Sequence, residues 1–395
     1  MMKITSKLAP YLFCVLSGLF LASCGGFTPP SPGLWQGEPV SSISAHLQAS
    51  NESWFITSTG KHKDMKWGAT GKNLNDVCFW DDKTGVAVGG MGAYKTEDGG
   101  FTWKHLKVDP EGGWSAVRMA GPSEIWIAGA RHPGGPGMGF MRHSVDGGAT
   151  WQTVLDGQIQ GASRICLTPV DQPGGHPKGH IWVVPGYHPV AFHSPDAGAT
   201  WSPINFQTKA PFIAKDICFT GDVPLQRDYA GYAVGHLFGN PVPTVLKTID
   251  AGKSWRTLEL PAATPPLSRI YFTTSEEGWV GGNGSVILYT ADGGRSWERR
   301  DLPVSTKGQP LTALLFFRNG KGWAAFPQPF DGKMHYEHTL FSTSDGGLTW
   351  CPVLSGRKDV HALWSNGPGT CWAVGNTPGY IAADLVAILA PSPEK

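Results

Sequence analysis

The sequence carries little charge. Only 16% of its 395 residues are Asp, Glu, Lys or Arg, and 32 basic residues against 31 acidic ones leave a formal net charge of +1. A chain this close to neutrality has no bulk electrostatic attraction for nucleic acid or for acidic membranes. We therefore expect no nucleic-acid partner.

The sequence also lacks the short motifs of several large enzyme and metalloprotein classes. It contains no P-loop, no Rossmann glycine pattern and no GxSxG nucleophile elbow. Its 13 histidines are accompanied by no CxxC, HExxH or CxxCH motif. Neighbouring histidines such as His335 and His338 lie in loops rich in Pro and Gly, without helical spacing. We expect neither a metal nor a cofactor.

Glycine, proline and tryptophan are abundant, with 53, 32 and 17 copies. A disordered chain would be poor in aromatic residues, so this composition does not indicate disorder. It fits many short strands joined by tight turns. Three cysteines, Cys78, Cys166 and Cys218, share one repeat position in three repeats, which predicts small buried core residues and not reactive thiols.

The N-terminal residues have the pattern of a secretion signal. Lys3 and Lys7 precede an apolar stretch from Leu8 to Leu21, which is shorter than the roughly 20 residues of a membrane-spanning helix. The stretch ends in LASCGG, which resembles the bacterial lipobox and implies lipidation of Cys24. An ordinary signal peptide with an incidental cysteine is the alternative.

This interpretation divides the chain into three parts. Residues 1–23 form the signal peptide, residues 24–45 are a tether rich in Pro, Gly and Ser, and residues 46–395 form the folded domain. We expect an exported lipoprotein held on a membrane by its lipid. The resemblance favours the outer membrane, facing the periplasm or the cell surface.

Six segments share the pattern S/T-x-D-x-G-x-S/T-W, known as the Asp-box. Their separations of 42 to 54 residues suit one four-stranded propeller blade per repeat. In such a turn the Asp accepts backbone N–H groups and the Gly adopts a positive φ, so we interpret these residues as structural and not catalytic. The six aspartates are Asp98, Asp146, Asp196, Asp250, Asp292 and Asp345.

A further unit, residues 359–389, has three strands of a blade but no Asp-box. Its fourth strand must come from elsewhere, and Ser53–Ser58 and Asp64–Thr70 are the candidates. Borrowing an N-terminal strand would close the ring and remove both sheet edges. The sequence thus predicts an all-β, seven-bladed β-propeller with an N-terminal strand closing the last blade, and six blades is the alternative.

The repeats resemble those of Asp-box families such as sialidases, sortilin-type receptors, endoglucanases and photosystem II assembly or stability factors. Residues 76–103 and 269–297 look most like the last family, with an I/V-x-F strand, then G-W/V-x-V-G, then T-x-D-G-G-x-T-W. That resemblance implies a non-enzymatic, chaperone-like factor for assembly of a membrane complex. The long insertions in blades two, three, four and six depart from the family pattern.

A sialidase-like protein is the competing interpretation. A resemblance to sialidases would imply an active site with an Arg triad, a Tyr nucleophile and a Glu. It would also imply an F/Y-R-I-P motif before these residues, and this chain lacks that motif. Arg118 and four other charged residues are predicted on inner strands, where an arginine cluster or a ring of alternating charges around an axial channel would form. The four candidate channel charges are Asp76, Arg164, Asp216 and Arg269.

Binding is expected on the face opposite the Asp-box turns, where the long insertions fall on loops between second and third strands. Aromatic residues, His and Pro on neighbouring loops suit recognition of a protein or peptide, although they could simply plug the channel mouth. The candidates are Arg131, His132, Tyr187, His188, His236, Phe238, His335 and Tyr336. We expect a monomeric, non-enzymatic scaffold that binds a protein partner, and the alternative is a glycan-active or glycan-binding propeller.

Overall fold

The structure is a computed structural model that describes most of the predicted folded domain. The described residues are 47–49, 52–57, 74–90, 92–108, 112–131, 139–159, 161, 164–168, 179–220, 230–304, 308–327, 338–355, 359–367, 370–377 and 383–391. Within them the regular structure is β, apart from one 3-10 turn at Asn283–Ser285. None of these residues belongs to a helix long and apolar enough to cross a membrane.

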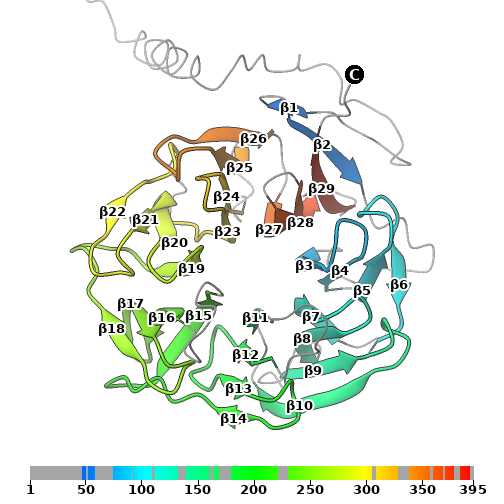
Figure 1. The fold of residues 1–395 in the computed structure, drawn as a ribbon, viewed down its shortest axis with the longest axis horizontal. Coiled ribbons are helices and arrows are strands. Elements are labelled where there is room, and N and C mark those ends of the chain that lie inside the picture. The colour runs from blue at the N-terminus through cyan, green and yellow to red at the C-terminus, as the bar shows by residue number, and fades with distance from the viewer. Residues whose placement is uncertain are drawn as a thin grey trace, which may run out of the picture.

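The described strands form seven sheets arranged in a ring about a common axis (Figure 1). Six sheets have four strands each, connected in sequence order, and we number them blades one to six. Blade one contains β3 (Leu74–Phe79), β4 (Gly85–Gly89), β5 (Gly92–Thr96) and β6 (Lys104–Leu106). Blade two contains β7 (Gly112–Met119), β8 (Ile125–Arg131), β9 (Gly139–Ser144) and β10 (Gln152–Ile159). Blade three contains β11 (Arg164–Leu167), β12 (Ile181–Val184), β13 (Phe192–Ser194) and β14 (Ser202–Pro203).

The other three blades repeat this plan. Blade four contains β15 (Phe212–Phe219), β16 (Gly231–Leu237), β17 (Asn240–Thr248) and β18 (Arg256–Leu258). Blade five contains β19 (Leu267–Phe272), β20 (Gly278–Gly282), β21 (Ile287–Thr290) and β22 (Glu298–Arg299). Blade six contains β23 (Ala313–Phe316), β24 (Gly322–Ala325), β25 (His338–Thr343) and β26 (Cys351–Ser355).

A five-stranded sheet lies between blades six and one, and we name it the closing sheet. Its strands, in order from the axis, are β27 (Asp359–Gly367), β28 (Thr370–Thr377), β29 (Ala383–Pro391), β2 (Glu52–Thr57) and β1 (Leu47–Ala49). Strand β2 pairs antiparallel with β29 from Glu52↔Pro391 to Thr57↔Val386. An N-terminal strand therefore joins the last sheet, and it comes from the first of the two predicted segments.

The all-β propeller fold is confirmed. The six regular blades, each with one Asp-box, match the number expected by the six-bladed alternative. The seven-bladed prediction depends on the closing sheet, which has no Asp-box and has five strands drawn from both ends of the folded domain.

Each Asp-box joins the third and fourth strands of its blade through the same hydrogen bonds. In blade one the Thr96 hydroxyl donates to Asp98 Oδ1 at 2.8 Å and accepts the Gly100 N–H at 2.9 Å. The backbone N–H of Thr102 donates to Asp98 Oδ1 at 2.8 Å, and its hydroxyl donates to Oδ2 at 2.5 Å. The two box glycines have φ of +80° and +98°, which a residue with a Cβ rarely adopts. The other five boxes repeat these contacts around Asp146, Asp196, Asp250, Asp292 and Asp345.

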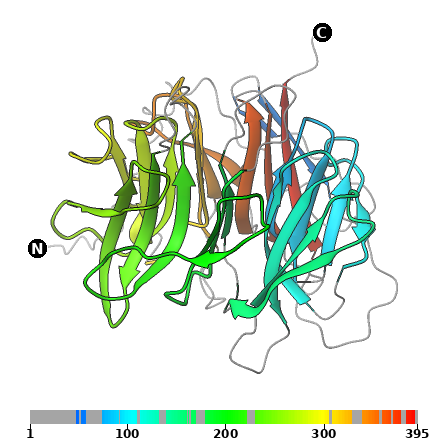
Figure 2. The ribbon, with the colours of Figure 1, turned by 60° about the horizontal axis from the view of Figure 1, so that its bottom comes forward.

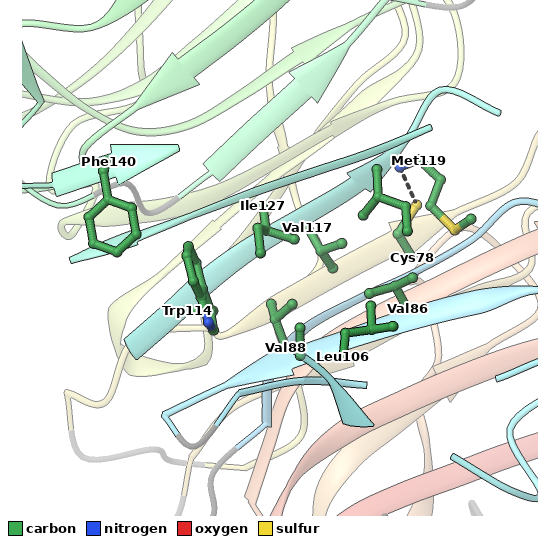
Figure 3. Packing of buried hydrophobic residues seen from close by; sticks show 11 residues of the cluster. Cys78, Val86, Val88, Leu106, Trp114, Val117, Met119, Ile127 and Phe140 are labelled. Carbon is green, nitrogen blue, oxygen red and sulfur yellow. Dashed lines mark hydrogen bonds between the residues drawn. The ribbon is translucent and has the colours of Figure 1, made fainter. Parts of the chain in front are cut away.

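The hydrophobic core is divided into seven clusters, each between two neighbouring sheets. Figure 3 shows the cluster in which Cys78 and Val88 of blade one meet Trp114 and Val117 of blade two. Burial raises the pKa of the Cys78 thiol to about 12, so this cysteine acts as a small apolar side chain. Because cores lie between sheets and not within them, each sheet is stable only as part of the ring.

An aromatic wedge on the second strand links most neighbouring sheets. Trp279 of blade five is fully buried, stacks on Phe316 of blade six with ring centroids 3.9 Å apart, and donates its indole N–H to Gly346 O at 2.9 Å. Gly346 belongs to the Asp-box of blade six, so this box turn also receives the wedge of the preceding sheet. Equivalent stacks join three more pairs of sheets: Trp182–Phe219, Tyr232–Phe272 and Trp372–Phe79.

Candidate functional site

The inner strands β3, β7, β11, β15, β19, β23 and β27 surround the axis, each in contact with the next (Figure 1). In five of them an extra residue shifts the pairing register: Asn75, Ser115, Lys215, Ser268 and His361. These β-bulges turn a side chain toward the neighbouring sheet. Asn75 Nδ2 donates to Trp114 O at 2.7 Å, and His361 Nδ1 donates to Leu74 O at 2.8 Å, which connects the closing sheet to blade one.

Asp76 follows the bulge of blade one and is buried against blade two. Its Oδ1 accepts the N–H of Val77 at 3.0 Å, and its Oδ2 accepts the N–H of Val117 at 3.0 Å. Arg118 donates to the same Oδ2 at 2.8 Å, in an ion pair whose two side chains are 20% and 4% exposed. This carboxylate is fully used in holding two neighbouring blades together.

Asp216 repeats the arrangement between blades four and five. It accepts the N–H of Ile217 at 3.0 Å and that of Ile270 at 3.3 Å. Its cationic partner, Arg164, comes from blade three, with Nε 3.7 Å from Asp216 Oδ1. Arg164 Nη2 also donates to Thr312 O of blade six at 3.3 Å, so this side chain reaches across the axis.

Arg269 differs from the other two arginines. Its Nε also donates to Thr312 O, and its Nη1 donates to Ser268 O at 2.7 Å. Among the described residues it has no carboxylate within the 4.0 Å of an ion pair. Burial, together with the nearby charge of Arg164, lowers the pKa of Arg269 to about 9. Of the four predicted channel charges, the structure pairs Asp216 with Arg164 and Asp76 with Arg118, and it leaves Arg269 on backbone carbonyls.

Lys215 adds a further cation on the face that carries the loops between second and third strands. No motif in the sequence indicated this residue. Its ammonium donates to Gly186 O and lies 4.3 Å from the ring centre of Tyr187, both in the loop between β12 and β13. Burial and the charge of Arg269 lower the pKa of Lys215, and burial with the charge of Lys215 lowers that of His236. Lys215 precedes Asp216 as Asn75 precedes Asp76, and this shared offset could have identified it as a bulge residue.

The structure describes part of the predicted binding face. Tyr187 and Phe238 are 82% and 61% exposed. His188 is half-buried, and its Nδ1 accepts the N–H of Val190 at 3.2 Å, so it stabilises its own loop. Arg131 ends strand β8. The predictions for Cys24, His132, His335 and Tyr336 lie outside the described residues.

The predicted insertion of blade four is not an irregular loop. Strands β16 and β17 pair up to Leu237↔Asn240, so Phe238 and Gly239 form the tip of an extended hairpin. Figure 2 shows that the connections between strands lie on two opposite faces of the ring. Gly239 has φ of +75°, which lets the chain reverse in two residues. Phe238 is therefore presented on a rigid support.

The arrangement required by the sialidase-like alternative is only partly present. Arg118, Arg164 and Arg269 do gather near the axis, but the first two are paired with Asp76 and Asp216. No Glu is in hydrogen-bond or ion-pair contact with these arginines among the described residues. Among the same residues, no three His, Cys, Asp or Glu side chains are grouped so that they could hold a metal ion.

The comparisons with known proteins agree with this geometry. The sequence profile of the family described as Photosynthesis system II assembly factor YCF48 matches residues 216–316, about a quarter of the chain. No curated protein matches the chain. The structure of YCF48 bound to D1 peptide superposes with a TM-score of 0.58 at 18% identity, covering 91% of this chain and 99% of that one.

Two further solved structures show how widely the fold is shared. YCF48 from Cyanidioschyzon merolae has a TM-score of 0.56 at 15% identity, covering 86% of this chain and 99% of that one. The GH74 xyloglucanase from Xanthomonas campestris has a TM-score of 0.55 at 14% identity, and the match covers 82% of this chain but 53% of the enzyme. At these identities the likeness concerns the fold. The chain is a BNR-type β-propeller that resembles the photosystem II assembly factor.

Proposed function

We propose that this protein is a non-enzymatic scaffold that binds a segment of a protein partner on the face opposite its Asp-box turns, as an assembly or stability factor for a membrane complex. The observation that carries the proposal is the pair of exposed aromatic residues, Tyr187 and Phe238, on the same face as the partly buried cation Lys215. Aromatic anchors on rigid supports beside polar groups are typical of protein recognition surfaces.

The similarity to YCF48 supports the same proposal. One solved YCF48 structure is described as bound to a D1 peptide, and its fold matches 91% of this chain. The described residues also lack the Tyr–Glu pair next to an arginine cluster that a sialidase-like enzyme would need. The neighbouring genes would be the first indication of which membrane complex is the partner.

The proposal places the propeller on a membrane through a lipid on Cys24 and a tether over residues 24–45.

We also propose that the closing sheet is a seventh blade, because β2 occupies the fourth-strand position and hydrophobic clusters pack on both sides of the sheet. Deleting residues 47–57 should then destabilise the whole ring, whereas deleting part of the tether should not.

A capture experiment tests the binding function. The full chain is used to retrieve partners from the solubilised membrane fraction of its host, in parallel with a Tyr187→Ala/Phe238→Ala variant. Phe101→Ala is the matched control, since Phe101 is 53% exposed on the Asp-box face. Loss of two aromatic anchors should reduce recovery of a specific partner by about tenfold or more, because such anchors contribute about 2 kcal/mol each at interfaces. Equal recovery by all three proteins would contradict the proposed face.

A further inference from the structure

We propose that the Asp-box face of the ring lies on a lipid bilayer and inserts exposed apolar turn residues into its headgroup region. This contact rests on the membrane location proposed above, and it uses the face opposite the one that binds the protein partner. Five large apolar side chains, between 48% and 65% exposed, carry the proposal. We name them the apolar tips, and they are Trp80, Phe101, Val145, Ile249 and Leu348.

The apolar tips share one face because of the way each blade is connected. Trp80 follows β3 in the turn to β4, and the other four tips belong to Asp-boxes, which join third and fourth strands. The two kinds of turn are neighbours, since the N–H of Gly99 in the box of blade one donates to Lys83 O in the β3–β4 turn at 2.9 Å. In blade five, the N–H of Gly293 donates to Glu276 O at 2.7 Å in the same way. The connections lie on two opposite faces of the ring (Figure 2), and all five tips belong to one of them.

The exposed positions of the Asp-boxes are unusually apolar for surface turns. In the pattern S/T-x-D-x-G-x-S/T-W, the second and sixth residues are exposed in all six boxes that the structure describes. Among these twelve side chains Glu97 is acidic, Lys253 and Arg295 are basic, Ser344 is polar and the other eight are apolar. Turns that face water are normally polar. The excess of apolar residues indicates that this face contacts something other than water.

The distribution of the tips favours a bilayer over a protein as the contacted surface. They lie on blades one, two, four and six, and therefore around the ring and not at one point (Figure 1). A protein interface obtains most of its binding energy from a few neighbouring anchors at its centre. A flat bilayer can receive separate single anchors at the same time, and tryptophan is enriched at its interface.

The charges of this face fit a zwitterionic lipid surface. Lys253 and Arg295 are exposed in their boxes and can reach lipid phosphates. Asp81 and Asp82, next to Trp80, are also exposed and offset these cations. The contact therefore depends on the apolar tips and requires no acidic lipid.

The polar groups of the box turns are already hydrogen-bonded, so placing them among headgroups costs little. Asp98 accepts both the N–H and the hydroxyl of Thr102, and the Thr96 hydroxyl connects Asp98 to Gly100. These bonds also hold each turn in one conformation, which reduces the entropy that is lost when a tip inserts.

The N-terminal segment joins the ring close to the same face. Strand β2 begins at Glu52, which pairs with Pro391 at the end of β29. This end of the closing sheet is on the Asp-box side, since Trp372 near the start of β28 donates its indole N–H to Gly99 O in the box of blade one at 2.8 Å. Strand β1 has three residues, which span about 10 Å. The predicted lipid and tether would therefore hold this face at the membrane.

The test reconstitutes the full chain into phosphatidylcholine vesicles whose acyl chains carry bromine near the headgroups, because bromine quenches tryptophan fluorescence on contact. Flotation of the vesicles first shows that the chain is held on them. The emission of Trp80 is the difference between the unchanged chain and Trp80→Phe. Tyr187→Trp is the control, since residue 187 is 82% exposed on the opposite face. We expect Trp80 to be quenched about threefold or more strongly than the indole that Tyr187→Trp introduces.

A pair of substitutions tests whether the tips insert. Phe101→Ser combined with Leu348→Ser should reduce the quenching of Trp80 by about half or more, because two anchors lose their apolar contact. Both side chains are exposed, so the fold does not depend on them. Tyr187→Ser combined with Phe238→Ser, which removes two exposed aromatic side chains from the other face, should leave the quenching unchanged.

Three results would overturn the proposal. The first is no quenching of Trp80, or quenching equal to that of the indole introduced by Tyr187→Trp. The second is unchanged quenching of Trp80 in the Phe101→Ser/Leu348→Ser variant. The third is a dimer of the full chain in detergent that the same double variant dissociates, because a second copy would then cover this face.

The outcome is separable from that of the capture experiment, because the vesicles contain no partner and the capture uses no bilayer. Quenching of Trp80 without retention of a partner would support the membrane face and contradict the scaffold function. A chain that floats with the vesicles and retains a partner, but leaves Trp80 unquenched, would do the reverse. A chain that does not float would contradict the membrane location and this inference with it.

Discussion

Two arginines near the axis should differ strongly in how much the same substitution destabilises the protein. Arg118→Gln leaves Asp76, with a side chain only 4% exposed, buried without its cation. Removing one partner of a buried ion pair typically costs about 3–5 kcal/mol. Asp76 keeps two backbone N–H donors and Arg118 is 20% exposed, so we expect the free energy of unfolding to fall by about 2–4 kcal/mol.

Arg269→Gln removes a half-buried cation that lies beside Arg164 and has no carboxylate partner in the described structure. The lost hydrogen bonds to Thr312 O and Ser268 O are offset by relief of that repulsion, and Thr312 O still accepts from Arg164. We expect a change within about 1 kcal/mol of zero. A ligand-free protein is essential, because a bound anion would stabilise only the chain that retains Arg269.

Urea denaturation followed by tryptophan fluorescence gives both free energies by linear extrapolation. The two variants share one chemical change, so effects on the unfolded chain largely cancel in their difference. Equal destabilisation by Arg118→Gln and Arg269→Gln would refute the reasoning, because it would mean that Arg269 is as much a structural ion-pair residue as Arg118.

Three further predictions concern the Trp wedges, the Asp-boxes and the lipid. Trp279→Phe should lower the free energy of unfolding by about 1–3 kcal/mol more than Trp323→Phe, as measured by urea denaturation. Both side chains are fully buried, but only the Trp279 indole has a hydrogen-bond acceptor in the described structure. Hydrogen bonds from Thr150 lower the pKa of Asp146, so its stabilising effect is present above about pH 4 and is lost as the pH falls through the folded value; Asp146→Asn should therefore lower stability at pH 7 more than at pH 3, measured by the urea midpoint. Cys24→Ser should move the protein from the membrane to the soluble fraction and abolish its labelling by a fatty acid, as followed by fractionation and mass spectrometry.

The local motifs were predictable from the sequence because their interactions are local. The contacts of Asp98 lie within a few residues of it, so its role as a turn residue follows from the pattern alone. The need for a borrowed strand followed from the missing fourth strand after residue 389. Of the seven predicted blades, six regular ones are confirmed; the remaining sheet has five strands built from both ends of the domain and no repeat signal of its own in the sequence.

The axial site was less predictable because β-bulges decide it. An extra residue in an inner strand changes which side chain faces the neighbouring sheet, and no particular residue type marks the position of such a bulge. The sequence placed Arg118, Arg164 and Arg269 near Asp76 and Asp216 but could not tell which arginine would be left over. The blade-four insertion was predicted as a loop, because its Pro and Gly residues are typical of loops, whereas the structure pairs β16 with β17 through it.

The two faces of the ring differ in how completely their polar groups are used. On the Asp-box face, the carboxylate of Asp146 accepts bonds from two hydroxyls and a backbone N–H, and these bonds lower its pKa. A group so fully bonded within its own turn has little capacity left for a ligand. On the opposite side, Arg269 and Lys215 donate to backbone carbonyls and have no carboxylate partner within the described part of the chain, and Lys215 lies beside the exposed ring of Tyr187. Because incompletely satisfied charge is costly to the fold and useful to a site, binding of the protein partner is expected there and not among the conspicuous repeats.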